Sequence, residues 1–132
     1  MARVVVYEHS MTILEGGTYD DVFRWLVGGA PVNLLNYTGI MQIRRKMADV
    51  TALLEIPFIP TPWVADGATG IYIMDEGIDG KYKVYINDRD TLNLCPDHRN
   101  SSGIHTLFLY NSFGESVLKQ HGPVSFIASG AR

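Results

Sequence analysis

The chain has 132 residues, of which 46% are hydrophobic and 19% charged, a composition that fits one globular domain with its own core. Eleven basic against 14 acidic residues give a net charge of −3, which is too close to neutral to indicate nucleic acid as the main ligand. The single cysteine, Cys95, excludes an internal disulfide. Because no apolar run is long enough for a signal-peptide core or a bilayer span, we expect a soluble protein made in the cytoplasm, without membrane insertion.

The N-terminal part predicts short strands. Arg3–Tyr7 is rich in β-branched residues, and Ser10–Leu14 is a second short extended piece that ends at a glycine pair. Thr18–Val27 fits both helical spacing and alternation, but glycine pairs at both ends favour a strand of hairpin length. Residues 1–9 form either an arm or an added strand.

The segment from Pro31 to Arg44 gives the clearest turn-to-strand signal. Pro31 suits the start of a strand, and Asn33 and Asn36 tolerate tight-turn geometry through side-chain bonds to the backbone. The strand that follows alternates with a period of two, which is typical of a half-buried strand. One face carries Gly39, Met41 and Ile43, and the other carries Thr38, Ile40, Gln42 and Arg44.

Two motifs in this half resemble those of small structural proteins of tailed phages and prophages. These proteins have a Gly-Asp-Thr-aromatic start, then a Pro-Val-Asp-Leu-Thr-Gly-Tyr-Thr turn and a Met-Gln-Ile-Arg strand. Here the sequence reads Gly-Gly-Thr-Tyr at 16–19, Pro-Val-Asn-Leu-Leu-Asn-Tyr-Thr at 31–38 and Met-Gln-Ile-Arg at 41–44. The chain departs from the pattern at Gly17, Asn33, Leu35 and Asn36.

The chain is most similar to the N-terminal β-sandwich domain of phage baseplate upper proteins. Beyond Arg44 the similarity is one of pattern, although the order of elements continues to about Ile127. The motifs are structural rather than catalytic. The resemblance therefore implies a β-sandwich fold and a virion setting, with copies of itself and other virion proteins as partners.

The remaining elements also predict short strands between turns. Three prolines forbid regular sheet across Pro57–Trp63, and Asn87 or Asp88 could cap a single helical turn near Asp88–Leu92. Turns or loops are expected at Arg45–Asp49, Asp75–Gly80, Pro96–Gly103 and Asn111–Gly114, with a loose tail at 129–132. Strands are expected at Thr51–Ile56, Ile71–Met74, Lys81–Ile86, Ile104–Tyr110, Glu115–His121 and Val124–Ala128.

About eight short strands at regular spacing predict an all-β fold, a single antiparallel β-sandwich or barrel over residues 1–132. No repeat or linker indicates a domain boundary.

Candidate chemistry is sparse. The one group that hints at a metal site consists of Cys95, His98 and, further on, His105. A structural zinc site usually needs four ligands, and a single Cys-x-x-His pair supplies only two of them. Acidic residues gather at 75–79 and 88–90 without the spacing of a calcium loop. Neither a nucleophile motif nor a phosphate loop occurs. We therefore expect no catalytic residue, cofactor or metal.

Two segments indicate contacts with other chains. Phe58, Ile59 and Trp63 lie in the proline-rich stretch, which either folds over an open end of the protein or faces another subunit. The N-terminal strand, with Val4, Val5, Val6 and Tyr7, could pair within its own sheet or onto a neighbour's edge.

Together these features predict a non-enzymatic virion component of a tail, baseplate or neck that assembles in multiple copies and serves as an attachment point. A capsid decoration or head-fibre protein is the alternative in the same setting. A carbohydrate-binding β-sandwich, with Trp25, Trp63 and tyrosines as stacking faces, is the alternative of another class and the only one with a glycan partner.

Overall fold

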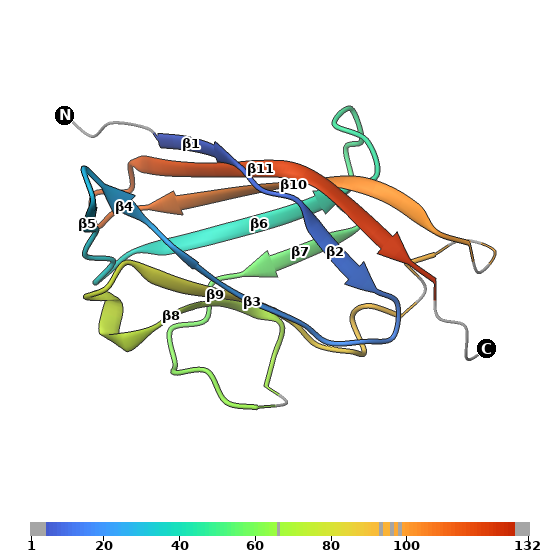
Figure 1. Cartoon of the computed structure of the whole chain (residues 1–132), viewed down its shortest axis with the longest axis horizontal. Coiled ribbons are helices and arrows are strands. Elements are labelled where there is room, and N and C mark those ends of the chain that lie inside the picture. Colours follow the sequence, from blue (N-terminus) through green and yellow to red (C-terminus); the bar gives the residue numbers. More distant parts are fainter. Residues whose placement is uncertain (1–4, 66, 93, 96, 98, 129–132) are drawn as a thin grey trace.

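The structure is a computed structural model, and it describes residues 5–65, 67–92, 94–95, 97 and 99–128, with the backbone alone at 5–7, 76 and 117–119. About half of the chain lies in β-strands, and these residues contain no α-helix. The prediction of an all-β protein is therefore confirmed (Figure 1).

The larger sheet has six strands, and β10 and β11 at its centre form a long hairpin. Beyond β10 lie β6 and β7, each antiparallel to its neighbour. Beyond β11 lie β1 and β2, which pair with its first and second half. The bounds are Val5–Glu8 for β1, Met11–Leu14 for β2, Thr38–Arg44 for β6, Leu54–Pro57 for β7, Ser101–Tyr110 for β10 and Ser116–Ile127 for β11.

The N-terminal strands correct the expected all-antiparallel arrangement, because both β1 and β2 run parallel to β11. Both strands pair with β11, which is one continuous strand where the sequence predicted two. The segment from β1 to β2 runs alongside β11 past Gly122. A Cβ atom at Gly122 would lie 2.0 Å from the carbonyl oxygen of His9. Only glycine permits this close approach of two backbones.

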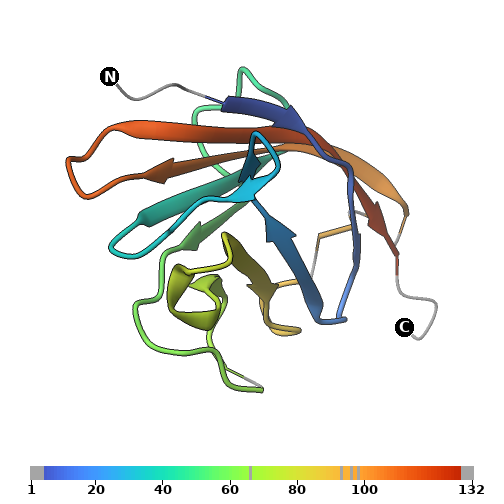
Figure 2. The same ribbon diagram turned by 60° about the vertical axis from the view of Figure 1, so that its left-hand side comes forward.

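The second sheet has three antiparallel strands in the order β3-β9-β8. Their bounds are Tyr19–Arg24, Lys81–Ile86 and Gly70–Ile73, and a minimal hairpin of β4 (Leu26–Val27) and β5 (Ala30–Pro31) follows β3. After β7 the chain crosses to this sheet, where Phe58 bridges to Ile71 and the Ile59 N–H donates to the Ile71 carbonyl at 3.0 Å. Figure 2 shows the two sheets curling toward each other.

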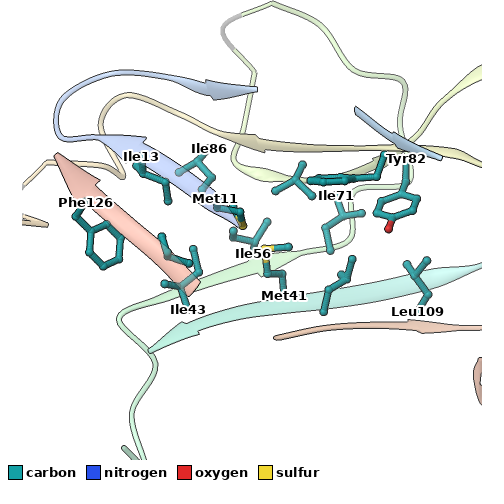
Figure 3. Packing of buried hydrophobic residues seen from close by; sticks show 14 of the residues in the cluster. Met11, Ile13, Met41, Ile43, Ile56, Ile71, Tyr82, Ile86, Leu109 and Phe126 are labelled. Atoms are coloured by element: carbon teal, nitrogen blue, oxygen red, sulfur yellow. The ribbon is translucent and has the colours of Figure 1, made fainter. Parts of the chain in front are cut away.

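The core lies between these sheets (Figure 3). Met41 and Ile43 of β6 are fully buried while Ile40, Gln42 and Arg44 are partly exposed, so the predicted alternation of this strand is confirmed. Neighbouring strands supply the other large buried side chains, among them Met11, Ile13, Ile56, Ile71, Tyr82, Ile86, Leu107, Leu109 and Phe126.

One local prediction is wrong. Asp88–Leu92 forms hydrogen-bonded turns rather than a helical turn, although Asn87 does accept the Arg89 N–H at 2.9 Å as a cap does. The 3₁₀ turn η1 occurs instead at Asp75–Gly77, where Gly77 has a positive φ of 85° that ends it. The expected turns at Arg45–Asp49 and Asn111–Gly114 are present.

Candidate functional site

An apolar groove of about 710 Å³ lies at one end of the molecule. The turn before β6 forms one wall, the loop after β7 forms the other, and the end of β8 with the start of η1 closes it. The two segments that the sequence singled out, 31–44 and 57–63, therefore meet at one site.

The turn wall is held by its own asparagines and by a neighbouring loop. Asn33 Oδ1 accepts the Leu35 N–H at 2.9 Å, and the Leu34 N–H donates to the Gly77 carbonyl at 2.8 Å. Asn36 has a positive φ of 65°, a conformation that Asn and Gly tolerate best. The backbone of this turn therefore favours Asn or Gly at position 36.

The loop wall is fixed at two points on the smaller sheet. Ile59 packs on Gly70, since a Cβ atom there would lie 2.2 Å from Ile59 Cγ1. At the far end, the Trp63 ring lies edge-on to Tyr85 at 5.9 Å between centroids. Prolines at 57, 60 and 62 stiffen the span between these anchors. This wall is therefore ordered before anything binds.

A lysine lies beneath the same tryptophan. Lys83 Nζ is 3.5 Å from the centre of the Trp63 ring and 3.1 Å from a carboxylate oxygen of Asp20. Lys83 is only 7% exposed, and a buried ammonium needs such partners. One face of Trp63 is consequently occupied within its own chain.

The predicted interface residues have mixed positions. Phe58, Ile59 and Trp63 are partly buried. They contact the smaller sheet of their own chain and also line the groove, and a contact of this stretch with another subunit stays a prediction. In the N-terminal strand, the backbone of Val5–Glu8 pairs with β11 of the same chain, and Val4 lies outside the described residues.

The predicted Cys/His cluster is dispersed. Cys95 is buried in the core, and its N–H donates to Glu15 Oε2 at 2.8 Å, whereas His98 lies outside the described residues. His105 lies in β10 of the large sheet, where its ring contacts the Gln120 side chain. The part of the chain that the structure describes contains no group of three or more His, Cys, Asp or Glu side chains placed to hold a metal ion.

The acidic residues are divided between two places. Asp75 lines the groove mouth and lies 3.9 Å from the Lys81 ammonium. Asp90 is on the turn after β9, where it accepts the hydroxyl hydrogen of Thr69. Asp75 and Tyr37 are the ionisable side chains among the described residues that line the groove, and burial raises the pKa of the Tyr37 hydroxyl.

A chain of three buried polar side chains joins the two sheets, and no sequence motif indicates it. The Tyr82 hydroxyl donates to Gln120 Oε1 at 2.9 Å, and Gln120 Nε2 lies 3.2 Å from His105 Nε2. All three residues are fully buried. Burial lowers the pKa of His105 to about 4, with smaller contributions from His9 and His121. His105 is therefore neutral at pH 7, and its Nε2 accepts from the amide.

In comparisons with known proteins, no family model, curated protein or solved structure matches this chain. Among the described residues, none of the helical structure is long and apolar enough to cross a membrane.

Proposed function

We propose that this protein is a non-enzymatic structural component of a tailed-phage particle, in a tail, baseplate or neck position, where it assembles in multiple copies and docks other parts. The observation that carries the docking role is the apolar groove with two preordered walls. Its lining suits the burial of an apolar surface, and stiff walls lose little entropy on binding.

The virion setting rests on the sequence motifs. They fall on the structural parts of the site: Pro31–Thr38 forms the groove turn, and Met41–Arg44 belongs to β6. The positive φ of Asn36 is consistent with the glycine that the resembling proteins have there. We treat the two curled sheets as a variant of their β-sandwich, with β1 as an added N-terminal strand.

The alternatives differ in what they need from the surface. A capsid decoration or head-fibre protein would use the same groove and differ only in its place in the particle. A carbohydrate-binding module needs open aromatic faces, yet Trp25 is 5% exposed and lies edge-on to Tyr37, and Lys83 covers one face of Trp63. The structural role is therefore favoured.

Mass spectrometry of purified particles tests the proposal, alongside glycan-array binding by the purified chain. We expect peptides of this chain in intact particles, in several copies relative to a single-copy component, and no glycan binding. Absence from particles together with specific glycan binding would replace the structural role with the lectin role.

A further inference from the structure

The same end of the molecule carries an apolar side chain that projects into solvent. Phe113 is 85% exposed and sits in the turn of the β10–β11 hairpin. This turn follows Tyr110, which pairs with Thr38 at the start of β6, so the hairpin emerges beside the groove turn. Figure 2 shows the hairpin projecting on the same side of the molecule as the turn before β6 and the loop after β7.

The hairpin turn is locked by one asparagine. Asn111 Oδ1 accepts the N–H groups of Phe113 and Glu115, each at 3.0 Å, and its amide donates to the Glu115 carboxylate at 3.0 Å. Gly114 supplies the positive φ of 78° that the turn needs. Phe113 is therefore held outward by a rigid support rather than by a loose loop, and it keeps its exposure to water.

The groove nearby has room for an aromatic side chain and an apolar lining. At about 710 Å³ it has ample room for a phenyl ring, and its proline and aromatic walls are apolar. Its rim adds further exposed apolar surface at Leu35 (58%) and, on the neighbouring loop, at Ile78. An exposed aromatic knob and an apolar groove on one side of a molecule permit reciprocal insertion about a two-fold axis, each copy giving its knob to the other.

We propose that the groove binds a second copy of this chain, with Phe113 of each copy seated in the groove of the other. This inference rests on the proposed docking function and names its occupant. Buried aromatics at the centre of an interface commonly dominate its affinity, so Phe113 is the anchor of the contact and Leu35 belongs to the surface that surrounds it.

Analytical ultracentrifugation of the full chain, at concentrations up to about 1 mM where weak interfaces populate, tests the association. We expect a reversible dimer, weakened about 30-fold or more by Phe113→Ser. Val50→Ser is the matched control, because Val50 is 95% exposed but lies in the β6–β7 loop, at the other end of β6. A monomeric wild type, or equal effects of the two substitutions, would overturn the proposal.

Crosslinking tests the pairing itself. Thr61 lines the groove and is exposed, so a Phe113→Cys chain mixed with a Thr61→Cys chain should form a disulfide between the two species on mild oxidation. A Val50→Cys chain mixed with the Thr61→Cys chain should not. Equal crosslinking of both mixtures would show that the knob does not enter the groove. A monomer that still enters particles would overturn this inference alone and leave the proposed virion role standing.

Discussion

Trp63 shows how a residue can serve both the fold and the surface. Its ring covers the ammonium of Lys83, touches Tyr85, and contributes to the groove wall. Trp63→Ala removes the ring from Lys83 and leaves the loop with one anchor fewer. We expect a loss of about 2 kcal/mol in the free energy of unfolding, less than a fully buried aromatic costs, measured by urea denaturation.

Trp63→Phe is the control for that substitution, because it retains an aromatic face over Lys83. It should keep most of the stability. A Trp63→Ala chain as stable as the wild type would show that the loop is not held by this contact, and that the ring is free for another partner.

His105 gives the protein a calculable response to acid. Its pKa is lowered in the folded state from 6.5 to about 4, so the folded chain binds fewer protons than the unfolded chain between these values. The stability from neutral His105 is complete above about pH 6.5 and falls as the pH drops toward 4, by about 3 kcal/mol in all. Once protonated, His105 Nε2 is itself a donor, and it then faces the N–H donor of the Gln120 amide.

The pH dependence is tested by comparing wild type with His105→Gln, which cannot titrate. The variant is expected to be less stable at pH 7 but to lose about 3 kcal/mol less between pH 7 and pH 4, as measured by denaturant unfolding at each pH. Because carboxylates titrate in both chains, the difference between the two curves isolates His105. Parallel curves would show that the buried histidine does not titrate in this range.

At the scale of elements, the contact of β1–β2 with β11 depends on one glycine. Gly122→Ala places a methyl group against the His9 carbonyl, so the two backbones must separate. We expect a loss of about 2 kcal/mol or more and faster hydrogen exchange of the His9 N–H, which donates to the His121 carbonyl. Ser125→Ala, an exposed change in the same strand, should alter neither quantity.

The N-terminal strand also marks where local patterns stop being informative. The valine run predicted a strand correctly, but its parallel pairing depends on a partner more than 100 residues away in sequence. Gly122 and Pro123 fall between two predicted strands, but the structure has one continuous strand there. Gly122 instead allows the backbone of His9 to pass close by. Sequence spacing describes a strand and its faces, and it does not choose the strand's neighbour.

Across the whole molecule, the sequence predicted the all-β class, a turn-to-strand segment at Pro31–Arg44 and an irregular stretch at Pro57–Trp63, because prolines, asparagines and alternation act locally. It did not predict that Pro31–Thr38 and Pro57–Trp63 meet, since the crossing from β7 to β8 brings them together. Nor did it predict the chain from His105 through Gln120 to Tyr82, because isolated polar residues in alternating strands carry no signal of the opposite sheet.

We propose that the groove docks other subunits in a particle, and incorporation of a groove variant tests this role most directly. Leu35→Asp puts a charge on the rim at a side chain 58% exposed, so the fold should tolerate it, and Val50→Asp puts the same charge at the other end of β6. Both purified chains should unfold at wild-type denaturant concentrations. Quantitative mass spectrometry of particles assembled with each variant should find Leu35→Asp depleted at least about tenfold, as a loss of about 1.4 kcal/mol gives, and Val50→Asp at the wild-type level. Normal incorporation of Leu35→Asp would contradict a docking role for the groove.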